Sequence, residues 1–217
     1  MHIHIPDGVL PIWFWGSGYL VTFVFLAITL YKTKKDIKKI PLTAMMVAVM
    51  LIVMSIPLGI PFHINLSVFS GLMVGMYFSL IASFVVNLIL ASFGHGGLTI
   101  VGLNTIILWF EAIIGILLFK TLHKLSKNYF MTASISTFFA LVCSAFLVIG
   151  AVAISTVNPA EFLHHHKEME RLQVSLPTFI LITLPIAVIG AALEALITGS
   201  LVQYIRKIKP DLLERGK

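Results

Sequence analysis

Long apolar runs alternate with short polar or basic segments along the whole chain. The predominantly apolar runs cover residues 13–31, 42–58, 66–94, 98–118, 130–157 and 177–204. A helix rises about 1.5 Å per residue, so about 20 apolar residues cross a hydrocarbon layer roughly 30 Å thick. The pattern therefore predicts an all-α membrane protein with several transmembrane helices.

The run at residues 66–94 is too long for one straight crossing of the membrane. We interpret it as two tightly joined helices that turn near residues 75–77; one long tilted helix is the alternative. The first interpretation gives seven spans and the second gives six. In either case residues 1–217 form a single transmembrane domain.

The composition agrees with a membrane protein, because 59% of the 217 residues are hydrophobic and only 11% are charged. A soluble domain carries about a quarter charged residues. The single cysteine, Cys143, lies inside an apolar run, which excludes a disulfide framework and predicts a small buried side chain. The chain has no phosphate-binding loop, so it is not expected to hydrolyse ATP by itself.

The formal net charge of +6 could suggest binding to nucleic acid, but the distribution of the charges favours membrane orientation instead. Thirteen of the 15 lysines and arginines lie in the segments 32–39, 120–127 and 206–217, and the other two are Lys167 and Arg171. Cytoplasmic segments carry the excess of Lys and Arg. The sequence thus predicts an external N-terminus, a cytoplasmic C-terminus and an odd number of spans, which favours seven.

This orientation places most histidine-bearing segments on the same external side. They are the N-terminal segment 1–11, the Pro- and Gly-containing loop 56–65, the glycine turn 94–97 and the long polar loop 158–176. The clustering favours a metal site over a disordered N-terminal tail.

The N-terminal segment has the donors for a planar chelate. The α-amine of Met1, the deprotonated amide of His2 and its imidazole Nδ1 form two fused chelate rings. A planar nitrogen set suits Ni(II) or Cu(II) and suits tetrahedral Zn(II) poorly. A fourth nitrogen must come from elsewhere, and His63 is the candidate because Pro57 and Pro61 stiffen its loop. An interfacial histidine without a ligand role is the alternative for His63.

The other histidines have two interpretations each. His95 lies in a glycine turn, where it is either an ordinary hydrogen-bonded histidine or a partner that supports a ligating histidine. His164, His165 and His166 are either a metal-collecting tract or part of a solvated loop.

Four polar residues lie inside apolar runs and are predicted to face the bundle interior, because polar groups are costly in lipid. They are Asn87, Asn104, Glu111 and Glu194. Ala44 and Ala48 form a small-xxx-small pair that lets another helix approach closely, either within the bundle or in a partner.

Three motifs in this order resemble one known family. They are His4–Pro11 (HIPDGVLP), Gly94–Asn104 (GHGGLTIVGLN), and Glu194–Gly199 (EALITG) followed by Arg206–Leu213 (RKIKPDLL). The chain resembles the CbiM/NikM family, the substrate-binding membrane component of energy-coupling factor transporters for cobalt and nickel.

The resemblance implies a seven-span helical fold in a prokaryotic cell membrane. It implies that the N-terminal amine, the amide and imidazole of the second residue and one loop histidine bind the ion in a plane. It also implies that Ala44 and Ala48 contact a transmembrane coupling subunit, which two cytoplasmic ATPase subunits drive, with a small accessory membrane subunit as a further partner. Such a chain is a transport component and not an enzyme.

Two departures from the family pattern matter. Met1-His-Ile precedes His4-Ile-Pro-Asp-Gly, so two residues are inserted before the motif. His2 keeps the position next to the amine and His4 keeps the position relative to the helix; only the second residue gives the three-nitrogen chelate, which favours His2. His4, His95 and Asn104 are then additional ligands or residues that support the site. The second departure is Pro61-Phe-His63, which replaces a glycine-rich loop that ends in Gly-His.

The sequence therefore predicts the substrate-capture subunit of an ATP-driven importer for divalent nickel or cobalt. An intramembrane metal-dependent hydrolase is the alternative, and it would need an open coordination position and a general base. His95 and Glu161 are the outer-face candidates for such a role. A purely structural membrane protein is the third possibility, and the clustered histidines argue against it.

Overall fold

The computed structural model describes residues 10–56, 63–155 and 176–215, and every regular element in these ranges is a helix. In chain order they are α1 (Ile12–Thr33), η1 (Ile37–Lys39), α2 (Ile40–Met54), α3 (Ser67–Val74), α4 (Met76–Ser92), η2 (Leu98–Ile100), α5 (Val101–Leu125), α6 (Tyr129–Ser155), α7 (Leu176–Ile208) and α8 (Pro210–Arg215).

Five helical segments are long and apolar enough to cross a membrane. They are Ile12–Thr33, Ile37–Met54, Leu98–Leu125, Tyr129–Ile154 and Leu176–Ile208, and α4 is a shorter apolar helix. Large apolar side chains such as Leu20 and Leu181 are exposed on the outside of the bundle, as expected for a surface that faces lipid. The prediction of an all-α, multi-pass membrane protein is confirmed for the described residues.

The long apolar run is divided into two helices, as predicted. The break is at Gly75, whose φ of 85° and ψ of 170° end α3 and begin α4. A side chain would disfavour this φ, so glycine suits the position. The eight residues of α3 cover about 12 Å, and the 17 residues of α4 cover about 26 Å. A count of seven spans requires each of the two to be a separate crossing, and it stays a prediction.

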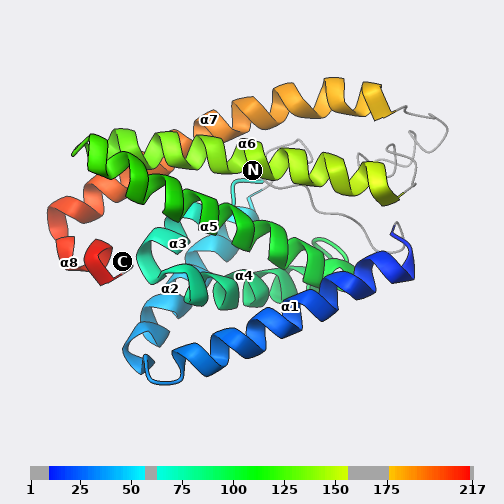
Figure 1. Cartoon of the computed structure of the whole chain (residues 1–217), viewed down its shortest axis with the longest axis horizontal. Helices are drawn as coiled ribbons and strands as arrows, with labels where there is room; N and C mark the ends of the chain where they lie inside the picture. Colours follow the sequence, from blue (N-terminus) through cyan, green and yellow to red (C-terminus); the bar gives the residue numbers. More distant parts are fainter. Residues whose placement is uncertain (1–9, 57–62, 156–175, 216–217) are drawn as a thin grey trace.

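Helix α3 is the centre of the largest core, and all eight of its residues are buried. Apolar side chains of α2, α5, α7 and α8 pack around it, including Met46, Phe119, Val202 and Leu213. In Figure 1, α6 and α7 run side by side along one edge, α1 runs along the opposite edge, and α5 lies between them. The short helix is thus enclosed by protein, which is the condition for a broken helix at membrane depth.

Helix α1 approaches the start of α5 very closely. A Cβ added to Gly102 would lie 2.6 Å from the backbone nitrogen of Tyr19. Across the same contact, Thr22 Oγ1 donates a hydrogen bond of 2.8 Å to the Gly102 carbonyl, and the Tyr19 hydroxyl donates to the Leu98 carbonyl. The absence of a side chain at Gly102 therefore sets the spacing of the two helices.

Two details differ from the sequence-based expectations. Helix α5 continues to Leu125, beyond the apolar run that ends at residue 118, because His123 and Lys124 suit the negative end of a helix dipole. Cys143 is exposed on α6, so the prediction that it is buried was wrong. An apolar run in a membrane protein has a lipid-facing side, and a small apolar residue is tolerated there.

Replacing Gly102 with alanine tests the close contact between α1 and α5. We expect Gly102→Ala to lower the free energy of unfolding by about 1–3 kcal/mol, because the methyl group meets backbone that cannot move aside. The matched control is Gly150→Ala on α6, where a Cβ meets no atom within 4 Å and removal of glycine slightly favours the helix. Thermal unfolding of the purified protein measures both; equal stability of the two variants would contradict the close contact.

Candidate metal site at the start of helix α3

Two histidines from separate loops meet just before α3. His63 Nε2 lies 3.2 Å from His95 Nε2, and the two rings are tilted by 66°. His63 is 6% exposed and His95 is half-buried. At this distance one ring donates an N–H to the other, and the tautomers decide which. The sequence placed these residues on the same side of the membrane, and the structure places them in contact.

The loop that carries His95 is shaped by its glycines. Gly94 and Gly96 have φ values of 75° and 89°, which favour glycine. The backbone nitrogen of His95 donates a 2.9 Å hydrogen bond to the Leu90 carbonyl, which closes the end of α4. The glycine turn therefore directs the His95 imidazole back towards His63.

The backbone that follows His63 is held by the carboxylate of Glu194 from α7. Glu194 Oε1 accepts a 2.8 Å hydrogen bond from the Leu66 amide, and Oε2 accepts one of 3.3 Å from the Asn65 amide. Glu194 is completely buried. The first N–H groups of a helix have no partner within the helix, and a carboxylate there also complements the helix dipole. Glu194 thus acts as the N-terminal cap of α3 from a distant part of the sequence.

A second buried carboxylate, Glu111 of α5, holds the side chains of the same turn. Its Oε2 accepts hydrogen bonds of 2.7 Å from Asn65 Nδ2 and from Ser67 Oγ, while its Oε1 accepts one from Ser144 Oγ of α6. Asn65 also accepts a 2.7 Å bond from the Ser67 amide through Oδ1. Three helices thereby fix the turn that carries His63.

Leu66 has an unusual backbone conformation at this point. Among the described residues it is the one non-glycine residue with a positive φ, 56°. Such a conformation costs about 1 kcal/mol or more for a bulky residue and persists where surrounding contacts enforce it. Here the two carboxylates supply those contacts, so the direction in which the chain leaves His63 is set by side chains of α5 and α7.

The other polar residues of the apolar runs also face the interior, as predicted. Asn87 and Asn104 are 3% and 2% exposed. Asn104 lies two helical turns before Glu111 on α5, hence on the same face of the helix. Its Oδ1 has no hydrogen-bond partner among the described residues.

Several predicted ligands lie outside the described residues: Met1, His2, His4 and His164–His166. Within residues 10–56, 63–155 and 176–215, no group of three or more His, Cys, Asp or Glu side chains is arranged to hold a metal ion. The two imidazoles are the histidine pair that these residues bring together.

The small-residue pair of α2 lies on the outside of the bundle. Ala44 and Ala48 are both exposed, while the opposite side of α2 buries Met46, Met50 and Met54. The sequence left open whether this pair packs within the bundle or against a partner. Among the described residues no helix covers it, so the surface is open to another helix.

The residues that the sequence analysis missed are Asn65, Ser67 and Ser144. Asn65 directly precedes an apolar run, and Ser67 lies two residues after Asn65. An asparagine or serine at this position is a signal for the start of a helix. Nothing in the local sequence indicates that their partners would be carboxylates from two distant helices.

The fold defines a multi-pass helical membrane protein, and the family comparison identifies it as a metal transport protein. Residues 4–212 match the family model described as "Cobalt uptake substrate-specific transmembrane region". The chain therefore belongs to the CbiM family. The matched part begins at His4, so Met1, His2 and Ile3 precede it.

Two solved structures share the fold at 20% sequence identity. The first, a truncated transition metal transporter, has a TM-score of 0.80 and matches 94% of this chain and 99% of its own. The second, a transition metal transporter, has a TM-score of 0.79, with coverage of 98% and 96%. No curated protein matches the sequence.

Replacing Glu194 with glutamine tests the cap on α3. Glutamine has one acceptor oxygen, so one of the two amides of Asn65 and Leu66 loses its partner in a buried place. We expect Glu194→Gln to lose about 1–3 kcal/mol of stability. Ser200→Ala on the same helix is the control, because that exposed hydroxyl bonds only to the Leu196 carbonyl. An unchanged melting temperature for Glu194→Gln would rule out the cap.

Proposed function

We propose that this protein is the substrate-capture subunit of an energy-coupling factor importer for divalent nickel or cobalt. The observation that carries the proposal is the position of His63, buried against His95 and fixed by Glu111 and Glu194 through the turn that follows it. A ligand that is held rigidly in a buried place binds an ion without first having to be ordered.

The proposed donors are the Met1 amine, the His2 amide and Nδ1, and one nitrogen of His63. Four nitrogens in a plane suit Ni(II) and, with axial ligands, Co(II). The contact between the His63 and His95 imidazoles supports the His63 part of this set. His4 is an additional donor in this proposal.

His95 has a supporting role in the proposal. A ligating histidine usually donates its other ring N–H to a partner, which fixes the ring and its tautomer. If His63 donates from Nε2 to His95 Nε2, the lone pair of His63 is on Nδ1, the nitrogen that would then bind the ion. Glu111 and Glu194 keep the backbone after His63 in place, so the His63 ring is presented from an ordered turn.

The proposed orientation follows from the distribution of Lys and Arg, with the N-terminus and the His63 site outside and the C-terminus in the cytoplasm. The ion is captured at the outer face of a seven-span bundle and is released inward when the partner subunits hydrolyse ATP. The partners are a transmembrane coupling subunit, two cytoplasmic ATPase subunits and a small accessory membrane subunit. The exposed pair Ala44 and Ala48 is the proposed contact with the coupling subunit.

Metal titration of ligand variants tests the site. Acetylation of the Met1 amine and His2→Ala should each weaken binding most, since either change destroys a chelate ring. His63→Ala removes one ligand and should cost less than His2→Ala. His95→Phe should cost roughly 10–100-fold, the usual loss for a supporting hydrogen bond. The binding constant of each variant is measured at one pH, because deprotonation of the amide makes affinity depend on pH.

The control for the titration is His123→Ala, because His123 lies at the far end of α5 and is not one of the proposed ligands. Binding as tight as wild type after acetylation, together with a severe loss in His4→Ala, would show that the site is built on His4. Wild-type affinity in His63→Ala would contradict the proposed function of the His63 turn.

Filling the surface of α2 tests the coupling proposal. Ala44→Leu with Ala48→Leu adds bulk to an exposed helix face, so metal binding by the isolated subunit should be unchanged. Co-purification with the coupling subunit and metal uptake by cells should both be lost. The matched control is Ala153→Leu with Ala192→Leu, two exposed alanines on α6 and α7. Normal assembly and uptake in the α2 variant would contradict this contact.

A further inference from the structure

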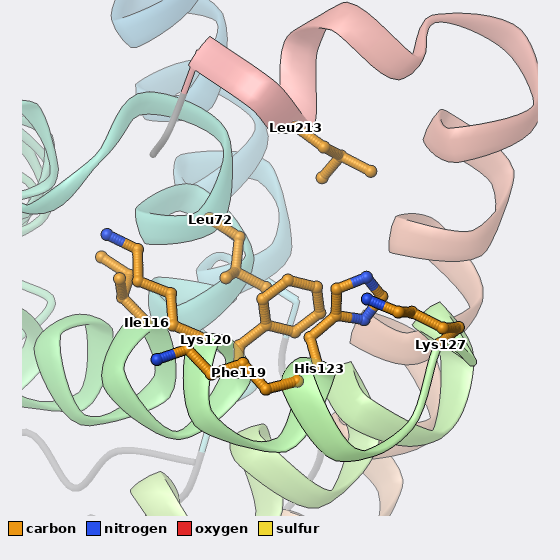
Figure 2. A pocket seen from close by; sticks show the side chains of 8 residues that line it. Leu72, Ile116, Phe119, Lys120, His123, Lys127 and Leu213 are labelled. Carbon is orange, nitrogen blue, oxygen red and sulfur yellow. The ribbon is translucent and has the colours of Figure 1, made fainter.

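A cavity of about 460 Å³ lies beside the C-terminal end of α5. The His95 turn lies at the other end of this helix, before its N-terminus. The cavity is lined by Leu72, Ile116, Phe119, Lys120, His123, Lys124, Lys127 and Leu213. Figure 2 shows Leu213 of α8 on one side of the cavity, with Phe119 and His123 of α5 on the other side and Leu72 of α3 beside them. None of these residues belongs to the proposed metal site.

The lining is divided into an apolar part and a cationic part. Leu72, Ile116, Phe119 and Leu213 are buried apolar side chains. Lys120, Lys124 and Lys127 supply three positive charges, and none of the described residues that line the cavity is acidic. A ligand that fits both parts is an amphiphile with an anionic group.

The order of the two parts along α5 matches the depth profile of a membrane. Ile116 and Phe119 belong to the apolar part of the helix, and Lys124 lies in its last turn. Ile116 and Lys124 are eight residues apart, or about 12 Å along the axis. The cavity is therefore apolar towards the bilayer interior and basic towards the surface, as the acyl chain and headgroup of a lipid require.

One wall of the cavity is built from stacked aromatic rings. The ring of His123 stacks on Phe119 with an interplanar angle of 4° and a centroid distance of 5.4 Å, and Tyr129 of α6 packs against it at 4.2 Å. The guanidinium of Arg206 lies 5.0 Å from the centre of the Tyr129 ring. This stack joins α5, α6 and α7 at the wall of the cavity.

A neighbouring cavity provides a contrast. It has a volume of about 290 Å³ and shares Ile116 and Lys120 with the first, but its lining includes the carboxylate of Asp36 as well as Lys39. An acidic side chain repels an anionic headgroup, so the neighbouring cavity is the less suitable of the two.

We propose that the cavity beside Lys120, Lys124 and Lys127 binds an anionic phospholipid, with the phosphate near the lysines and the first part of an acyl chain against Leu72 and Leu213. Basic pockets between transmembrane helices recognise anionic headgroups, and the volume is within the usual range for ligand sites. A peptide segment of a partner would also need an acidic group, but the ordered change from apolar to basic along a membrane helix favours a lipid.

Native mass spectrometry of the full-length protein tests the proposal. The protein is loaded with phosphatidylglycerol or with zwitterionic phosphatidylcholine, and the retained lipid is counted. We expect phosphatidylglycerol to be retained preferentially, and Lys124→Gln with Lys127→Gln to weaken its retention about tenfold. The matched control, Lys35→Gln with Lys38→Gln, removes the same charge from exposed positions outside the cavity and should retain the lipid as wild type does. Soluble glycerol phosphate, which has no acyl chain, should not displace the lipid.

Three outcomes would overturn the lipid site. They are equal retention of phosphatidylcholine, an equal loss of phosphatidylglycerol in both double variants, and complete displacement by glycerol phosphate, which would mean a simple anion site.

Co-expression with the coupling subunit distinguishes a lipid site from a contact with a partner protein. If Lys124→Gln with Lys127→Gln loses that subunit while it keeps wild-type retention of phosphatidylglycerol, the cavity is a protein contact and the proposal is wrong. Thermal unfolding confirms that both variants are folded.

Discussion

A helix that begins inside an apolar bundle leaves backbone N–H groups without partners, and the structure around α3 depends on how this problem is solved. Water or a capping serine is the usual solution at a protein surface. Here the amides of Asn65 and Leu66 bond to Glu194, and the amide of Ser67 bonds to Asn65, which is itself held by Glu111. Buried carboxylates are costly, and they are acceptable because each oxygen receives donors from the turn or from a neighbouring helix.

The same hydrogen bonds that allow α3 to begin there also determine the position of His63. The chain runs directly from His63 through Asn65 and the unusual backbone of Leu66 into α3, so bonds to α5 and α7 fix the backbone within two to three residues of His63. The same hydrogen bonds are therefore needed to bury α3 and to position His63. In physical terms, the proposed metal site is built on the helix start, so a change that destabilises the start of α3 should also disturb His63.

The sequence predicted the helices well, because a membrane helix must be apolar along its whole length and the polar interruptions are few. It also predicted the division of residues 66–94 near Gly75, where only the length of the run and a glycine were needed. The hydrogen-bond partners of the buried carboxylates could not be predicted from the sequence. Glu111 and Glu194 reach the turn at Asn65 and Leu66 only through tertiary packing. The exposure of Cys143 was mispredicted because apolarity alone does not separate a lipid-facing position from a core position. For the histidines, orientation could predict a shared side of the membrane but not the contact between His63 and His95.

Helix α5 connects the two proposed sites and contributes side chains to both. Glu111 contributes to the turn after His63, whereas Lys120 and Lys124 lie towards its C-terminal end beside the cavity. A dication that approaches the C-terminal end of α5 would meet repulsion from the lysines. An anionic lipid in the proposed cavity would offset that positive charge, so the two proposals meet in the electrostatics of this end of the helix.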